Sequence, residues 1–260
     1  MSALGTLLGG LAPGPDGIRA HIPEGWMQGR TAFGGITAAL ALAAARLELP
    51  DLPRLRSMQV AYLRPVGADA VLRTRLIRAG RTSSFVRVEV HSQGDLGATL
   101  LFVFGAARDT NHRHDRAPAP ALPAPQACPA FMPKGAGPNF LAQFDLKLAD
   151  GPFLVSGSDR PEFTTWSRLA DDRDVPPEIA LVCIADSLPP AAMTGFRKVA
   201  PISTITWSLD LAQVPVRNDW ISIRTTSLQA DEGYSVQDMA LHGADGRLIA
   251  SAQQLVALFD

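Results

Sequence analysis

Two kinds of apolar pattern occur in the first hundred residues. Residues 33–49 are rich in alanine and leucine, which favour helix, and Pro50 ends the run. From Ile36 to Ala45 the stretch has no polar face and only Thr37 interrupts it, and a helix that is apolar all round is buried on every side. Four strand-like runs follow, at residues 56–65, 69–79, 82–92 and 96–107.

The third run shows the strand pattern most clearly. Val86, Val88 and Val90 fall on one face, and Arg87 and Glu89 fall on the other. Alternation of this kind is typical of a half-buried strand. One buried helix followed by four long strands predicts an antiparallel sheet wrapped around that helix.

Residues 115–138 change character, because closely spaced prolines and glycines exclude regular helix and central strand there. Beyond this segment strands are predicted at 140–149 and 161–169, a helix at 176–188, and four further strands at 201–212, 219–229, 233–242 and 247–258. We therefore divide the chain into an N-terminal unit (1–114), a linker (115–138) and a C-terminal unit (139–260).

The order of one helix followed by four strands occurs twice. The segment that begins at Asp69 aligns with the segment that begins at Asp219, an offset of 150 residues, although identity between the halves is low. Repetition of a whole group of elements indicates a duplicated structural unit. The predicted fold is α+β, with two sheets that each wrap one helix and pair into one body.

Asp186 is the single acidic residue in the apolar stretch from Ile179 to Leu188. Prolines at 176–177 and 189–190 bracket this stretch as a short buried helix, with Asp186 near its C-terminal end. That end carries the negative pole of the helix dipole, and a buried, unpaired carboxylate costs several kcal/mol. Two interpretations stay open: a structural role, paired with an arginine or with backbone groups beyond the helix, and a role in catalysis.

Two further polar residues of the second half have apolar counterparts in the first half. The projected pairs are Asp186 with Ala44, Ser208 with Met58, and Gln254 with Phe102. Because the first copy folds without these polar groups, they point to chemistry that only the second copy keeps. Period two places Gln254 on one face of the closing strand, whereas a bulge would turn Gln253 inward instead.

A carboxylate, a hydroxyl and an amide can together hold one water molecule. The carboxylate takes the proton of the attacking water as a general base, and the other two groups orient that water. This chemistry predicts hydrolysis without a covalent nucleophile, with Asp186, Ser208 and Gln254 as the catalytic residues. Asp210 is a rival carboxylate on the same strand face as Ser208, with a structural ion pair as its alternative role.

Composition narrows the classes of partner. The formal charge of −1 implies no general attraction to nucleic acid or to an anionic membrane, and the longest apolar run is too short to span a bilayer. Two cysteines, Cys128 and Cys183, make no disulfide framework and favour a reduced, cytoplasmic compartment. The His112-Arg-His114 run has no third ligand nearby, which favours a solvated loop over a metal site.

The chain resembles the acyl-CoA thioesterase II family, the TesB-like double hotdog proteins. The segments that carry the resemblance are 28–36, 57–65, 183–186, 208–210 and 245–254, and they occur in the expected order. The resemblance implies hydrolysis of acyl-CoA without metal or cofactor, and it places the family's catalytic Asp, Thr and Gln on Asp186, Ser208 and Gln254. Serine replaces the usual threonine, and Gln59 stands where many members have histidine.

Three residues are candidates for binding the substrate. Gly34 and Gly35 open the first helix, where free N–H groups can polarise a thioester carbonyl, although close packing explains them equally well. For Arg64, anchoring of a strand end is the favoured role, and binding of a CoA phosphate is the alternative. Exposed sheet edges also predict a homo-oligomer.

Two other functions remain open. The first is a non-catalytic acyl-CoA or fatty-acyl binding protein that keeps the pocket. The second is a hotdog hydratase or dehydratase, which is disfavoured because none of the five histidines falls in either predicted helix.

Overall fold

The computed structural model describes residues 3–133, 135–213 and 219–260. Within these ranges, twelve strands form one antiparallel sheet, in the order β1-β2-β6-β7-β8-β5-β11-β14-β13-β12-β10-β9. The strands of the first half are β1 (Ala12–Gly14), β2 (Gly17–His21), β5 (Leu55–Tyr62), β6 (Asp69–Ala79), β7 (Ser83–Ser92) and β8 (Asp95–Gly105). Those of the second half are β9 (Phe144–Asp150), β10 (Glu162–Leu169), β11 (Ile202–Leu211), β12 (Ile221–Asp231), β13 (Tyr234–His242) and β14 (Leu248–Leu258).

The strand order is symmetric about the junction of β5 and β11. Moving outward from that junction, β8, β7, β6 and β2 on one side correspond to β14, β13, β12 and β10 on the other. The structure therefore confirms the predicted repeat and extends it, because two strands of the sheet precede the helix in each half, β1 and β2 in the first and β9 and β10 in the second.

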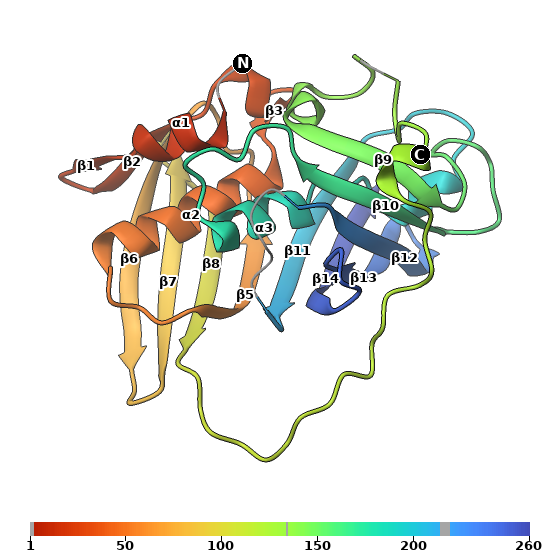
Figure 1. The fold of residues 1–260 in the computed structure, drawn as a ribbon. Helices are drawn as coiled ribbons and strands as arrows, with labels where there is room; N and C mark the ends of the chain where they lie inside the picture. The colour runs from red at the N-terminus through yellow and green to blue at the C-terminus, as the bar shows by residue number, and fades with distance from the viewer. Residues whose placement is uncertain (1–2, 134, 214–218) are drawn as a thin grey trace.

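Two helices lie side by side on the concave face of the sheet, α2 (Gly34–Glu48) and α3 (Pro177–Ala185) (Figure 1). As predicted, α2 is buried from Gly35 to Ala45. The central strands bury alternate residues beneath the helices, and one continuous core spans both halves. This arrangement is a double hotdog.

Smaller elements surround this frame. They are helix α1 (Leu4–Gly9), a two-stranded sheet of β3 (Met27–Gln28) and β4 (Thr31–Ala32), and four 3-10 turns, η1 (Glu24–Trp26), η2 (Pro125–Ala127), η3 (Asn139–Gln143) and η4 (Ala191–Thr194), within the described residues. The predicted strand at 140–149 is corrected here, because its first residues form η3 and β9 begins at Phe144. The predicted helix at 176–188 ends at Ala185, which leaves Asp186 as its C-cap.

The Pro-rich segment crosses from β8 to the second half as a long loop below the sheet (Figure 1). Residues 117–123 hold it at three points. The Trp166 indole donates to the carbonyl oxygen of Pro123 at 2.8 Å, His242 Nε2 donates to that of Ala117 at 2.9 Å, and the Ala119 N–H donates to Gly246 O at 3.2 Å. The segment thus follows a defined path over the second half of the sheet.

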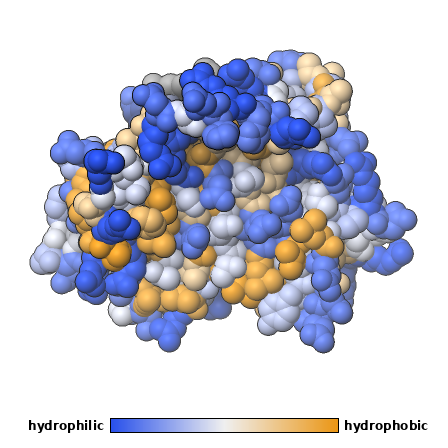
Figure 2. Space-filling view, turned by 90° about the horizontal axis from the view of Figure 1, so that it is seen from below, coloured by the Kyte–Doolittle hydropathy of each residue, from blue (hydrophilic) through white to orange (hydrophobic). Residues whose placement is uncertain are grey.

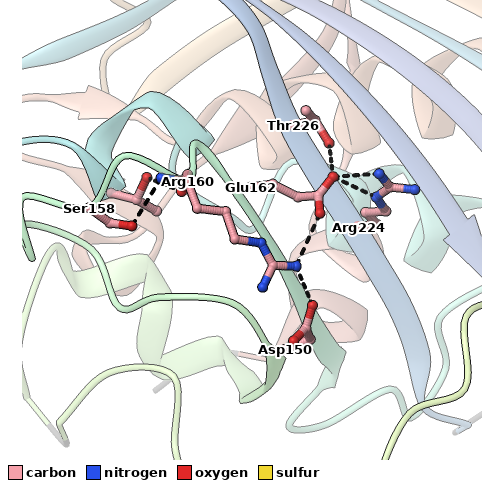
Figure 3. A network of polar contacts seen from close by, with 7 residues as sticks. Asp150, Ser158, Arg160, Glu162, Arg224 and Thr226 are labelled. Carbon is pink, nitrogen blue, oxygen red and sulfur yellow. Dashed lines mark hydrogen bonds and ion pairs between the residues drawn. The ribbon is translucent and has the colours of Figure 1, made fainter.

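Charged side chains join the outer strands of the second half (Figure 3). Arg160 binds both Asp150 of β9 and Glu162 of β10, and Glu162 also accepts hydrogen bonds from Arg224 and Thr226 of β12. The bond from Arg160 holds the pKa of the Asp150 carboxyl below its usual range. Because every charge in this network has a partner, we interpret it as structural.

The two edges of the sheet offer little unpaired backbone. Strand β1 has three residues, including Pro13. The outer side of β9 is covered by residues 129–131, because the Phe131 N–H donates to Leu146 O and the Leu148 N–H donates to Pro129 O. Short or covered edges discourage strand-to-strand pairing of molecules. The predicted homo-oligomer remains a prediction and would have to use another surface.

Large apolar side chains reach the surface on the β12–β13 hairpin, where Leu228, Tyr234 and Val236 are exposed. Seen from below, apolar residues form several patches between polar ones (Figure 2). No helix among the described residues has the length and apolar character needed to cross a bilayer.

Candidate active site

The carboxylate of Asp186 lies where the end of α3 meets the start of α2. Gln254 Nε2, from β14, donates to Asp186 Oδ1 at 2.6 Å. The backbone N–H of Gly35, in the first turn of α2, also donates to this carboxylate. The structure thus brings Asp186, Gln254 and Gly35 together. The sequence predicted the grouping of Asp186 with Gln254, whereas Gly35 was considered there only as a candidate donor to the thioester carbonyl.

The position of Asp186 explains how a carboxylate is tolerated near the C-terminal end of α3. The residue caps the negative end of α3, but its carboxylate points to the N-terminus of α2, where free N–H groups and the positive pole favour an anion. Asp186 keeps partial contact with solvent, whereas Gln254 is 6 % exposed. The carboxylate itself is enclosed by its neighbours.

Burial raises the pKa of Asp186 to about 7, against the opposing effects of the hydrogen bonds from Gln254 and Gly35. A carboxyl group with this pKa is ionised in a substantial fraction of molecules near neutral pH and still holds a proton well once it takes one. Those are the properties of a general base at physiological pH.

Gly34 and Gly35 leave no room for a side chain at the start of α2. A Cβ on Gly34 would lie 2.7 Å from Asp186 Oδ2 and 2.9 Å from Tyr62 Oη. A Cβ on Gly35 would lie 2.3 Å from Phe33 Cζ. The two glycines let the helix backbone approach the carboxylate closely. Close packing and proximity to the candidate site therefore both account for glycine at these positions.

Tyr62 is a site residue that the sequence did not single out. Its hydroxyl donates to the carbonyl oxygen of Gly34 at 2.9 Å. Burial is the main cause of a pKa well above the usual value for Tyr62, and the nearby Asp186 and Cys183 raise it further. The hydroxyl therefore stays protonated. The strand alternation that places Val60 inward also places Tyr62 inward, but nothing in the sequence links that face to Asp186.

Ser208 does not join this group, which corrects the prediction. Across β11 and β14, Trp207 pairs with Gln254 and Ser208 pairs with Gln253. Because paired residues share a face and successive residues alternate, Ser208 lies on the face opposite to Gln254. Burial agrees, since Trp207 and Leu209 are buried and Ser208 is only partly covered.

The error in the Ser208 assignment amounts to one residue of register. Phe102 pairs with Met58 as Gln254 pairs with Trp207. If Gln254 corresponds to Phe102, the counterpart of Met58 is therefore Trp207. The offset between β5 and β11 is thus 149 residues (207 − 58), one less than the 150 between Asp69 and Asp219. Both strands carry the same bulge, at Leu55/Ser57 and at Thr204/Thr206.

Three other residues considered from the sequence form no hydrogen bond with Asp186 within the described residues. Gln59 pairs with Ser208 on the outer face, and Asp210, two residues from Ser208, is exposed on that face. The Arg64 side chain is 59 % exposed and its Nη1 lies 2.7 Å from Asp95 Oδ1. Arg64 thus anchors a strand end in this structure, and the proposed contact with CoA stays a prediction.

The two antiparallel helices meet at a second junction, where the end of α2 faces the start of α3. Arg46 Nε and Nη2 donate to the two carboxylate oxygens of Glu178 at 2.6 and 2.9 Å. The Leu55 N–H donates to the same carboxylate at 3.3 Å. Here each charge also suits the helix end that carries it. This junction is closed by a structural ion pair, whereas the Asp186 junction holds an unpaired carboxylate.

Two buried polar groups beside Asp186 and Gln254 lack a hydrogen-bond partner in the described structure. They are the hydroxyl of Ser187, the next residue in the chain, and the indole Nε1 of Trp207, the cross-strand neighbour of Gln254. Buried donors without partners are rare in native proteins. Both lie next to the residues that hold the carboxylate.

Family profiles match both halves of the sequence. The profile described as the acyl-CoA thioesterase C-terminal domain matches residues 115–258, and that of the N-terminal domain matches residues 22–105. The chain belongs to the acyl-CoA thioesterase family. Among curated proteins, no significant match is found.

Solved structures with this architecture support the double hotdog. A hot dog fold protein of unknown function from Alicyclobacillus acidocaldarius has a TM-score of 0.86 at 20 % identity, covering 100 % of this chain and 99 % of that one. A putative thioesterase II from Thermobifida fusca YX has a TM-score of 0.83 at 22 % identity, covering 96 % and 95 %. The acyl-CoA thioesterase II TesB2 from Mycobacterium marinum has a TM-score of 0.77 at 17 % identity, covering 99 % and 98 %. At these identities the likeness concerns the fold.

Proposed function

We propose that the protein hydrolyses an acyl-CoA thioester to a free acid and CoA, with Asp186 as general base for the attacking water. One observation carries the proposal: a carboxylate with a pKa of about 7 stands at a helix N-terminus, held by Gln254 and by the Gly35 N–H. Membership of the acyl-CoA thioesterase family supplies the substrate class.

The reaction is written from these groups. Asp186 accepts a proton as the water oxygen bonds to the thioester carbonyl carbon, and the carbonyl oxygen becomes an oxyanion. The carbon–sulfur bond then breaks, and the proton held by Asp186 passes to the leaving thiolate. Gln254 fixes the carboxylate by its hydrogen bond, so that one oxygen faces the water.

Donors for the oxyanion come from the same junction. The Gly34 N–H belongs to the first helical turn, whose donors have no partner within their own helix. The Gly35 N–H is taken by Asp186, so its proposed role is to hold the base in place. Arg64 remains a proposed contact for a CoA phosphate, which would compete with Asp95 for its guanidinium.

The cellular setting is part of the proposal. Both cysteines, Cys128 and Cys183, are free and buried, which supports a reduced, cytoplasmic compartment. An acyl-CoA substrate fits a role in fatty acid metabolism.

Two other activities make different predictions. A non-catalytic acyl-CoA binding protein would use the same junction without turnover. A hydratase or dehydratase ordinarily needs a histidine beside the acid, and within the described residues Asp186 forms no hydrogen bond with a histidine.

The test is product analysis with a panel of saturated and unsaturated acyl-CoAs of different chain lengths. Release of one free acid and one CoA per substrate, followed with a thiol reagent and by mass spectrometry, is the expected result. Tight binding without CoA release would favour the binding protein. A hydrated acyl-CoA that retains its thioester would favour the hydratase.

A further inference from the structure

Trp207 is buried to 1 % exposure, yet its indole Nε1 has no hydrogen-bond partner in the described structure. Leaving a buried donor unpaired costs about 1–3 kcal/mol. The indole of Trp166 is the contrasting case, because it donates to Pro123 O at 2.8 Å. A buried indole N–H that stays unpaired needs an explanation, and a bound ligand is one.

The register places this indole beside the candidate base. Trp207 and Gln254 are direct cross-strand partners and share the inner face of the sheet. Gln254 in turn binds Asp186. Trp207 also pairs with Val60 of β5, two residues from Tyr62 on the same face. Trp207 thus lies on the inner face between β14 and β5, the strands that bring Gln254 and Tyr62 to Asp186.

The repeat supplies an internal control. The pairing of Phe102 with Met58 in the first half matches the pairing of Gln254 with Trp207 in the second. Met58 is buried and has no polar hydrogen, so the fold does not require a donor at this position. The indole N–H and the Gln254 amide occur together in the half that carries Asp186.

We propose that the Trp207 Nε1–H donates a hydrogen bond to the carbonyl oxygen of the bound acyl thioester. An indole nitrogen donates and cannot accept, so it suits an oxygen that gains negative charge. The attacking water needs a lone pair to bond to the carbonyl carbon, so a hydrogen bond from the indole to that water would hinder the attack. The carbonyl oxygen is therefore the better acceptor for the indole N–H. The inference rests on the proposed thioesterase function and names a residue that contacts the substrate in that reaction.

The first test removes the donor and keeps an aromatic ring. In Trp207→Phe, kcat for an acyl-CoA that the wild type hydrolyses is expected to fall at least tenfold, with KM changed less than threefold. Loss of one oxyanion donor costs about 10²–10³ in kcat in enzymes where it has been measured. Trp166→Phe, which removes a paired indole on β10, is the matched control and should retain wild-type kcat. A wild-type kcat in folded Trp207→Phe would overturn the proposal.

The second test observes the hydrogen bond in the wild-type protein and does not depend on that variant's stability. Two non-hydrolysable analogues are used: a ketone in which CH2 replaces the thioester sulfur, and an S-alkyl-CoA thioether that lacks the carbonyl. In 15N-correlated spectra, the ketone should move the Trp207 indole proton downfield, and the thioether should not. The signal is assigned by its loss in Trp207→Phe, or by elimination with Phe at the other three tryptophans.

The outcomes separate the two claims. If both analogues bind and the Trp207 signal moves equally with each or with neither, the indole assignment is wrong and the thioesterase proposal stands. If the wild type neither binds the analogues nor releases CoA from acyl-CoA, the proposed function fails and the indole assignment fails with it.

Discussion

Asp186 is set between two opposing influences. Burial favours the protonated carboxyl, whereas the donors from Gln254 and Gly35 favour the carboxylate. The balance places its pKa at about 7, close to neutral pH. A base tuned in this way takes a proton during attack and returns it to the leaving group.

This balance predicts the pH dependence of hydrolysis. Because the ionised form of Asp186 is the active base, kcat/KM should be low at acidic pH, rise through about pH 7 and level off above it. Gln254→Met removes the hydrogen bond that lowers this pKa, so the rising limb should move to higher pH. A rate profile that is flat between pH 5 and pH 9 would contradict the assignment of Asp186 as base.

The sequence predicted the members of the site unequally. Asp186 and Gln254 stand out because each is a polar residue in an apolar row, and their partnership could be inferred from the missing counterparts in the first half. Ser208 was wrong because the offset between β5 and β11 is 149 residues (207 − 58) and not the 150 taken from Asp69 and Asp219, and one residue of offset moves its side chain to the outer face. Tyr62 was missed because a strand tyrosine is common and its contact with Gly34 joins segments far apart in sequence.

At the scale of elements, the site depends on the short distance between the N-terminus of α2 and the Asp186 carboxylate. The Gly-Gly start brings backbone N–H groups to the carboxylate without a side chain between them. Alanine is the better helix former, so helix propensity does not explain glycine at these positions.

Gly34→Ala tests this close approach. Its Cβ would fall 2.7 Å from Asp186 Oδ2, so the carboxylate or the helix start must move, and we expect hydrolysis to fall at least tenfold. Gly9→Ala in α1 is the matched control, because a Cβ there meets no atom within 4 Å, and it should keep full activity. Both are measured as kcat/KM together with the urea midpoint. Unchanged hydrolysis in Gly34→Ala would show that the contact does not matter.

The principal elements were predictable from periodicity. The four strands of each half and helix α2 appear within a few residues of their predicted bounds, because long alternating runs and an apolar alanine-rich run have distinct periods. The short elements α1, β1 and β2 were not predicted, since three to six residues carry too little pattern. Their place is set by contacts with β6 and the core.

At the scale of the whole molecule, the duplicated halves share one sheet and one core, and two helix junctions connect them. One junction carries Asp186, and the other is closed by Arg46 and Glu178. In the proposed function, hydrolysis takes place at the end of the helix pair that holds Asp186, and the Arg46–Glu178 ion pair stabilises the other end. The division at residues 114 and 139 remains a prediction.

Glu178→Gln should weaken the connection between the halves. The side chains of Arg46 and Glu178 are 22 % and 14 % exposed, and loss of the carboxylate leaves a half-buried guanidinium with a weaker partner. We expect the free energy of unfolding in urea to fall by about 1–3 kcal/mol, with kcat of the folded enzyme unchanged. Arg173→Gln breaks an exposed pair with Asp171 and should leave the free energy of unfolding nearly unchanged. Equal effects of both variants would contradict a structural role for the second junction.

The central claim is that Asp186 activates the water that hydrolyses an acyl-CoA. The most direct measurement is the rate of CoA release by Asp186→Asn beside Asp210→Asn, which neutralises an exposed carboxylate on the outer face of β11. With both variants folded, we predict that Asp186→Asn lowers kcat by about 10²–10⁴ and that Asp210→Asn retains the wild-type rate. Wild-type CoA release by Asp186→Asn would contradict the account.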